Sequence, residues 1–490
     1  MAKRHLSIRK PSFMGMLSAI LTGAWMLAAP VLADEDPPKE KSGGGLSALV
    51  ESLFGGSAEP AAVEDPAIAS IPGASHVQSG SIKIRGNRSG HQLQAFSLNK
   101  EGLIFAVVAA PRSYGAKLEG KNNTAEIRVF SASGEELRQW PVDFAVQSIA
   151  ISPGGHVFVA GNGQIAKFDA EGKLLKSADA PHIAALLKNS AKLKEEAEAA
   201  LEEEKEQFAE QAKALKEQVE PQQKMLDELK AAVDAKPEAE RTTADKRKIR
   251  TLELAIKNME SQNKAALQFY KQRSERKIDD VISEMTSRLK IVNSLAATDQ
   301  DVFIASGVTK GYGYAIWRTS HDFDGSEQIV TGLSGCCGQM DIGCCDDKVF
   351  VAENSRKRVL QYDRDGKKLG QWGEGNRNGA AGAGFGGCCN PMNVCFGSNG
   401  EVLTSESEGY IKKFTKEGSF LGVVGQAKVS GGCKNVAIAM SPTGDKAYFF
   451  DLQGSRIVIL DKSAWEDEKP GKADKPADAE SVKARPVSLR

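Results

Sequence analysis

Short runs of alternating apolar and polar residues, each followed by a turn signal, recur along most of this chain. Such alternation predicts half-buried β-strands. Many runs end in one phrase, an aromatic residue followed by polar residues, a glycine and a leucine, as in Phe130-SASGEEL, Phe168-DAEGKLL, Tyr362-DRDGKKL and Phe414-TKEGSFL. The phrases recur at intervals of roughly 40 to 50 residues, which is the period of a four-stranded propeller blade. The pattern therefore predicts an all-β fold built from repeated blades.

The repeat units lie on both sides of a segment that lacks them. Two units precede it, at roughly 91–142 and 143–182, and four follow it, starting near Val292, Cys336, Cys388 and Cys433. We therefore expect a six-bladed β-propeller, with blades 1–2 in residues 79–182 and blades 3–6 in residues 291–463. The last unit is one strand short, and Ser81-IKIRG is expected to supply that strand. This pairing would close the ring and remove exposed strand edges.

Residues 183–290 interrupt the repeats with a different pattern. The segment holds no Gly, Cys or Trp and is rich in Ala, Glu, Lys, Gln and Leu, which is typical of a long helix. Apolar residues recur at heptad-like spacing in both halves, for example at Leu201, Phe208 and Leu215 and at Ile249, Leu252, Ile256 and Met259.

A polar loop, Asp234-AKPEAERTTAD, separates these two halves. We therefore expect an inserted coiled-coil α-helical hairpin, with arms roughly 70 Å long. Pro221 is expected to kink or interrupt the first arm. A single solvated helix without a partner is the alternative interpretation.

The two ends of the chain differ in composition from the repeats. Residues 1–33 combine a basic start, a nearly continuous apolar run and small residues up to Ala33, which is the pattern of a signal peptide. An uncleaved anchor is the alternative, because the run approaches the roughly 18 residues that suggest a membrane span. Residues 34–78 predict a disordered linker, and residues 464–490 a disordered tail. We expect an exported protein, either periplasmic or secreted.

One stretch of the repeats resembles a known family. Residues 370–425, GQWGEGNRNGAAGAGFGGCCNPMNVCFGSNGEVLTSESEGYIKKFTKEGSFLGVVG, contain a Gly-rich loop, a Pro-x-x-Val strand and an aromatic-x-x-x-Gly hairpin. Phe350-VAENSRKRVLQYDRDGKKLGQW has a similar pattern, and both resemble the NHL repeat. The resemblance covers Gln147–Asp169 and 336–461 clearly, and 291–335 weakly.

The NHL resemblance implies a six-bladed propeller from a family used mostly for binding. It also implies that some relatives are hydrolases or lyases with a metal in the channel. The paired cysteines and the helical insertion of this chain depart from the NHL pattern.

The charges are balanced, with 64 Lys and Arg against 64 Asp and Glu and a formal net charge of zero. A protein that binds nucleic acid would show a basic stripe, so nucleic acid is not an expected partner. We expect a protein or another cell-envelope macromolecule as the partner, together with self-association through the coiled coil. Contact with a membrane is expected only through an uncleaved N-terminal segment.

The eight cysteines all lie in the later repeats, at Cys336, Cys337, Cys344, Cys345, Cys388, Cys389, Cys395 and Cys433. Aligning the repeats places Cys337, Cys389 and Cys433 at nearly the same point of three consecutive blades. That point is the entry to the innermost strand, at the rim of the channel. Cys336 and Cys388 precede it by one residue. The alignment predicts an arc of thiols on neighbouring blades.

Three interpretations of the cysteines stay open. An even count in an exported chain favours disulfides between neighbouring blades. Clustered thiolates would instead select Zn or Cu, with Cys336, Cys337, Cys388, Cys389 and Cys433 as the candidate ligands. No CxxC motif or nearby His supports such a metal. The third interpretation is free buried thiols that pack as small apolar side chains. No other cofactor is expected.

Candidate catalytic groups are few. A hydrolase or lyase site in the channel would need carboxylates, Asn or His that converge from inner strands. Asp341 and Asn393 lie near such positions, and Glu353 and Glu406 align with each other at strand ends. Turn and loop hydrogen bonding is the favoured interpretation of all four. We therefore predict a non-enzymatic exported scaffold that binds a macromolecule, with a propeller enzyme or a thiolate metal protein as the alternative.

We expect export to remove the N-terminal segment near Ala33, because a basic start, an apolar run and small residues precede the acidic Asp34-Glu35-Asp36. Intact-mass measurement of the exported protein, or its N-terminal sequencing, checks this expectation. A chain that keeps Met1 and fractionates with the membrane would favour the anchor.

Overall fold

The computed structural model describes residues 71–88, 90–111, 123–309, 313–337, 339–376, 382–429 and 437–463. The predicted signal peptide, most of the predicted linker, the predicted tail and Cys433 lie outside these described residues. Among the helices of the described part, none is both long enough and apolar enough to cross a membrane.

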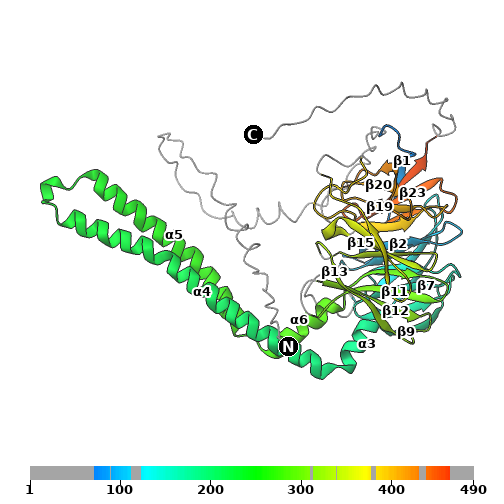
Figure 1. Ribbon diagram of the computed structural model, residues 1–490, viewed down its shortest axis with the longest axis horizontal. Coiled ribbons are helices and arrows are strands. Elements are labelled where there is room, and N and C mark those ends of the chain that lie inside the picture. The colour runs from blue at the N-terminus through cyan, green and yellow to red at the C-terminus, as the bar shows by residue number, and fades with distance from the viewer. Residues whose placement is uncertain are drawn as a thin grey trace, which may run out of the picture. The chain divides into compact units, whose positions relative to one another are not determined.

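Six four-stranded antiparallel sheets make up the β-structure of the described residues (Figure 1). The first two sheets contain β2 (Gln92–Leu98), β3 (Ile104–Ala109), β4 (Ala125–Phe130) and β5 (Glu136–Val142), then β6 (Ser148–Ile151), β7 (Val157–Gly161), β8 (Gln164–Phe168) and β9 (Leu174–Asp179). The third contains β10 (Val292–Ala297), β11 (Asp301–Gly307), β12 (Gly313–Ser320) and β13 (Glu327–Ser334).

The remaining three sheets follow in chain order. The fourth contains β14 (Asp341–Cys345), β15 (Lys348–Glu353), β16 (Arg358–Tyr362) and β17 (Lys368–Trp372). The fifth contains β18 (Asn393–Phe396), β19 (Val402–Ser405), β20 (Tyr410–Phe414) and β21 (Phe420–Gln426). The sixth joins β22 (Ile438–Met440), β23 (Lys446–Asp451) and β24 (Arg456–Lys462) to β1 (His76–Lys83).

The sixth sheet combines the first and the last described strands of the chain. β1 pairs antiparallel with β24, with Ser81 opposite Val458 and Ile82 opposite Ile457. The expectation that Ser81-IKIRG completes the last repeat is therefore confirmed. The strand begins at His76, so the predicted linker boundary at residue 78 lies three residues too late.

The first strand of each sheet contacts the first strands of both neighbouring sheets, in the order β2, β6, β10, β14, β18, β22 and back to β2. Residues of all six strands line one cavity of about 240 Å³. Sheets arranged radially around a central cavity, with their first strands innermost, form a β-propeller. The prediction of an all-β propeller is therefore confirmed.

Side-chain oxygens on the inner strands, or directly before them, join neighbouring sheets. Each accepts a hydrogen bond from a main-chain N–H on the first strand of the next sheet. The pairs, with N···O distances, are Gln147 with Val292 at 2.8 Å, Ser294 with Ile342 at 3.2 Å, Asp341 with Val394 at 2.8 Å and Asn393 with Ile438 at 3.1 Å.

The recurring glycine of the repeat phrase has a steric cause. Gly172 and Gly418 both have φ of +93°, which L side chains rarely adopt. A Cβ at Gly172 would lie 2.5 Å from the Trp140 ring, and one at Gly418 would lie 2.3 Å from the Trp372 ring. Trp140 lies within β5 and Trp372 ends β17, and each of these is the last strand of the preceding sheet. The glycine therefore allows neighbouring sheets to pack closely.

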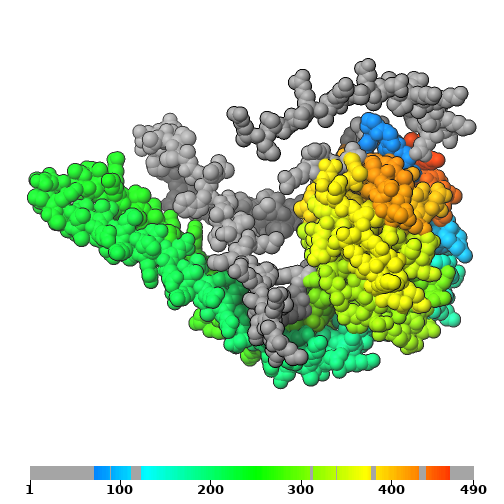
Figure 2. Space-filling view, viewed as in Figure 1, coloured from blue at the N-terminus to red at the C-terminus, as the bar shows by residue number. Residues whose placement is uncertain are grey.

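A helical segment separates the second sheet from the third. It consists of α3 (Pro181–Lys188), α4 (Ser190–Asp234), a 3-10 turn (Glu238–Glu240), α5 (Thr243–Ser274) and α6 (Ile278–Leu289). The helices begin at Pro181, two residues before the predicted boundary, and end one residue before it. α4 and α5 lie side by side as an antiparallel pair whose side chains are in contact along the hairpin (Figure 2).

Contacts between α4 and α5 follow the predicted seam. Phe208 stacks on Tyr270 with ring centroids 5.5 Å apart, and Asn263 Nδ2 donates a hydrogen bond to the Leu215 carbonyl at 3.0 Å. Helix α4 continues through Pro221, so the interruption suggested for that position does not occur. A proline removes one main-chain hydrogen bond, and packing along a 45-residue helix offsets that loss.

The base of the helical segment is held by a buried histidine. His182 Nε2, in α3, donates a hydrogen bond to the Leu289 carbonyl at the end of α6, at 2.8 Å. Its Nδ1 is buried and has no hydrogen-bond partner, so the ring is neutral. Burial lowers the His182 pKa to about 4, although the hydrogen bond to Leu289 opposes that shift.

We expect acidification to destabilise this base. The folded state favours neutral His182, so its contribution is complete above about pH 6.5 and is lost as the pH falls toward about 4. The full shift corresponds to about 3 kcal/mol. Urea unfolding of wild type and His182→Gln at about pH 7 and pH 5 measures it, because Gln keeps an N–H donor without titrating. Equal losses of stability in the two proteins would contradict the assignment.

Candidate functional site

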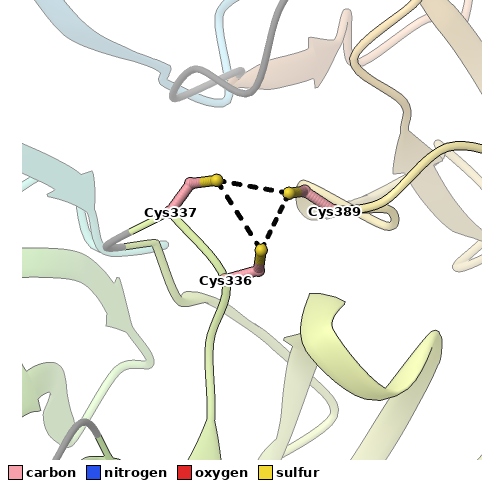
Figure 3. Close-up of side chains that lie close together, drawn as sticks. All are labelled: Cys336, Cys337 and Cys389. Carbon is pink, nitrogen blue, oxygen red and sulfur yellow. Dashed lines mark hydrogen bonds between the residues drawn. The ribbon is translucent and has the colours of Figure 1, made fainter. Parts of the chain in front are cut away.

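Three cysteine sulfurs meet where two neighbouring sheets begin. Cys336 and Cys337 lie between β13 and β14, and Cys389 precedes β18 (Figure 3). The Sγ atoms are 3.0 Å apart for Cys336 and Cys389, 3.4 Å for Cys337 and Cys389, and 3.6 Å for Cys336 and Cys337. The Sγ of Cys388 lies 3.1 Å from that of Cys389. We call Cys336, Cys337 and Cys389 the thiol cluster.

The loop that carries Cys336 is fixed by the end of β15. The Ser334 N–H donates to Glu353 Oε1 at 2.9 Å, and the Cys336 N–H donates to Asn354 Oδ1 at 2.7 Å. Glu353 is fully buried and forms an ion pair with Arg358. A buried, paired carboxylate therefore sets the path of the main chain at Cys336.

The loop that carries Cys389 is fixed in a related way by β19 and β20. Glu406 and Lys412 are both fully buried, and their Oε1 and Nζ atoms lie 2.7 Å apart. Lys412 also donates to the Gly384 carbonyl at 2.5 Å, and the Gly386 N–H donates to Glu406 at 3.4 Å. Burial raises the pKa of Glu406, and Lys412 opposes this shift.

Asn390 strengthens the same loop. Its amide donates to the Gly386 carbonyl at 3.0 Å and to Glu408 at 2.9 Å, and its carbonyl accepts from the Ser407 N–H at 2.8 Å. Glu353 and Glu406 thus take part in loop hydrogen bonding, as the sequence analysis favoured. Neither Lys412 nor Asn390 was recognised from sequence. Lys412 could have been found from the alternation of the strand, because it shares a face with the buried Phe414 and so occupies an interior position.

The environment of the thiol cluster affects its protonation. Cys389 donates a hydrogen bond to Cys336, which lowers the Cys336 pKa, but burial and the adjacent Cys337 raise it, and the net pKa lies above its usual value. Cys337 has φ of +54°, in the left-handed region that non-glycine residues seldom occupy. Strain of this kind often accompanies function.

Three further described cysteines lie on the inner strands. Cys344 and Cys345 are in β14, and Cys395 is in β18. Each packs against a hydrophobic cluster, and burial raises all three pKa values. Cys389 is itself buried in the hydrophobic cluster against which Cys336 and Cys395 pack, so the thiol cluster is distinguished by its sulfur–sulfur contacts and not by a lack of packing. Cys433, the third member of the predicted arc, lies outside the described residues.

No disulfide involves Cys336 or Cys337 in this structure. Their sulfur separations exceed the roughly 2.05 Å of an S–S bond. The disulfides expected between neighbouring sheets therefore remain a prediction.

The central cavity contains the other two candidate residues, Asp341 and Asn393. Asp341 accepts hydrogen bonds from Ser294 Oγ at 2.7 Å and from the Val394 N–H at 2.8 Å. Asn393 accepts from the Ile438 N–H at 3.1 Å. Both side chains therefore join neighbouring sheets.

Comparison with protein-family models gave no match, and no curated protein matches the sequence. Similar solved structures include a gluconolactonase from Xanthomonas campestris, with 8% identity and a TM-score of 0.36, covering 81% of this chain and 99% of that one. They also include regucalcin, a calcium-binding protein from Agrobacterium tumefaciens, with 8% identity and a TM-score of 0.38, covering 78% and 93%.

The WD40 propeller domain of Doa1 is similar too, with 8% identity and a TM-score of 0.36, covering 80% of this chain and 98% of that one. At these values the likenesses carry no argument about activity.

We expect Lys412→Met to destabilise the protein by about 3–5 kcal/mol, because it leaves the Glu406 carboxylate buried without its ion-pair partner. The matched control is Glu406→Gln combined with Lys412→Met, which removes the buried charge and should recover most of the loss. Urea unfolding measures both. A single variant as stable as the double variant would show that the buried pair does not hold this loop.

Proposed function

We propose that this chain is an exported, six-bladed propeller scaffold of the NHL type that binds protein rather than catalysing a reaction. The observation that carries the proposal is the use of polar groups on the inner strands. Asp341, Asn393, Ser294 and Gln147 each accept a hydrogen bond from the next sheet. Groups that serve these junctions are poorly suited to bind and release a substrate.

The channel also offers little acid–base chemistry. Asp341 is the only carboxylate among the described residues that line the cavity, and the described lining includes no histidine. General acid–base catalysis or metal ligation usually requires several such groups to converge. A hydrolase or lyase site in the channel is therefore the less favoured alternative.

The helical hairpin supplies the binding surface that we assign. Three large apolar side chains on α4 and α5 are more than half exposed, namely Met225 at 59%, Leu254 at 58% and Phe269 at 52%. A groove of about 440 Å³ also lies on the hairpin, lined by residues that include Leu215, Val219 and Leu267. Exposed apolar side chains and an apolar groove on a coiled coil favour a further helix as the partner.

We assign a second copy of this chain as the partner of these exposed apolar positions. The hairpin combines its exposed apolar positions with ion pairs of its own, such as Lys230 of α4 with Glu253 of α5, whose side-chain atoms are 2.7 Å apart. A second hairpin would bring the same pattern, and symmetric pairing of identical surfaces is the commonest form of self-association. We therefore assign self-association to the hairpin. Paired hairpins would hold two propellers together.

We expect excision of residues 183–290, with a short Gly/Ser link in their place, to preserve the β-type circular dichroism and to abolish self-association. The ends of the segment lie close together, since His182 bonds Leu289. Sedimentation equilibrium measures the mass of the mature full chain and of the excised form. Loss of the β signal would contradict the insertion, and a monomeric full chain would contradict self-association.

Point variants locate the surface. Phe269→Glu and Met225→Glu should shift the full chain toward monomer by about tenfold or more in dissociation constant, because each places a charge in an apolar contact. Leu421→Glu is the matched control, because Leu421 is 49% exposed but lies in β21 of the propeller. An equal effect of all three substitutions would contradict the assignment to the hairpin.

A further inference from the structure

We infer that the thiol cluster is a binding site for a soft d10 metal ion, Zn(II) or Cu(I). Cys336, Cys337 and Cys389 come from two neighbouring sheets, and their sulfurs all lie within 4.8 Å of one another. The inference does not rest on the hairpin or on the proposed scaffold role, because it concerns only the loops before β14 and β18.

The donor atoms define the class of metal. The group consists of sulfur alone, with no imidazole or carboxylate among its described members. Thiolates favour Cu(I) and Zn(II), whereas Mg²⁺ and Ca²⁺ prefer oxygen ligands. Three sulfurs suit three-coordinate Cu(I), and they also suit Zn(II) with a fourth ligand. Cys388, whose sulfur lies 3.1 Å from that of Cys389, is the candidate for that fourth position.

The spacing of the sulfurs fits an ion after a small expansion. With a metal–sulfur bond of about 2.3 Å, neighbouring sulfurs would lie about 3.8 Å apart in a tetrahedral site and about 4.0 Å apart in a trigonal one. The observed separations are 3.0, 3.4 and 3.6 Å. Each pair therefore needs to open by about 1 Å or less, which small side-chain rotations accomplish.

The surrounding structure holds the sulfurs together before any ion binds. The Cys336 N–H is fixed by Asn354, and the Cys389 loop is fixed by the buried Glu406 and Lys412. Such outer hydrogen bonds orient metal ligands and raise affinity. Lys357 also donates to the Gly386 carbonyl at 2.9 Å, which brings a positive charge to the loop of Cys389.

Cys337 supplies the observation that packing alone does not explain. Its side chain is exposed, and its φ of +54° suits glycine better than cysteine. A thiol used only for packing would gain nothing at an exposed, left-handed position. In the cluster, that backbone conformation directs the Cys337 sulfur toward Cys336 and Cys389 (Figure 3).

The test is a metal titration of the reduced, full-length protein under anaerobic conditions. Zn(II) and Cu(I) are added separately against a chromogenic chelator specific for each, and the better competitor identifies the ion. We expect one equivalent of metal per chain. Cys336→Ser and Cys389→Ser should weaken binding by about 100-fold or more, and Asn354→Ala by about 10- to 100-fold. Cys345→Ala is the matched control, because Cys345 lies on β14 outside the cluster, and it should leave affinity unchanged.

Cys337→Gly separates binding from folding. Glycine relieves the left-handed backbone, so thermal stability of the metal-free protein should stay the same or rise, while metal affinity falls by about 100-fold. The inference is overturned if the reduced protein binds neither ion more tightly than the Cys336→Ser/Cys337→Gly/Cys389→Ser variant. It is also overturned if Cys345→Ala weakens binding as much as Cys336→Ser. A native protein that retains an S–S bond between Cys336 and Cys389 would replace the metal site with a disulfide.

Discussion

Close packing between neighbouring sheets is the constraint on which the rest of this structure depends. A four-stranded sheet with two apolar faces cannot bury both faces alone, so each sheet needs a neighbour on either side. Gly172 lies against Trp140 and Gly418 against Trp372, and the absence of a Cβ at each glycine allows neighbouring sheets to approach each other. Hydrogen bonds that inner-strand side chains such as Asp341 accept from the next sheet set the distance at the channel. The thiol cluster exists because this packing brings the starts of β14 and β18 together.

Much of the fold could be predicted from the sequence because its causes are local and repeated. The phrase that begins at Phe168 or Phe414 recurs with its glycine, so the number and order of the expected strands follow from counting the repeats. Ser81-IKIRG could be assigned to the last sheet because that unit lacked one strand. The hairpin was visible in the spacing of Phe208 and its neighbours. The interruption expected at Pro221 does not occur, because the long contact with α5 tolerates a residue that local geometry disfavours in a helix.

The candidate site was only partly visible in the sequence. Alignment of the repeats placed Cys337 and Cys389 at the same point of consecutive blades. Cys344 and Cys395 are cysteines of the same repeats, and they differ from this pair only in lying on strands. Sequence alone does not tell a loop sulfur that meets two others from a strand sulfur that packs. Glu353 and Glu406 were recognised as aligned, yet their role depends on contacts with loops some 20 residues away in the chain. Such contacts arise only from tertiary packing.

The bond between His182 and Leu289 joins residues 107 positions apart. A helical hairpin consists of contacts between neighbouring turns and a single reversal, so it forms quickly compared with a sheet that must pair distant segments. Once it has formed, the end of β9 lies close to the start of β10, and the ring closes as though the insertion were a short loop. We expect the pairing of β1 with β24 to come late, because β24 is the last described strand to be synthesised. We therefore expect the connectivity of the chain to set the order of assembly, with the helical hairpin among its earliest structures and the pairing of β1 with β24 among its last.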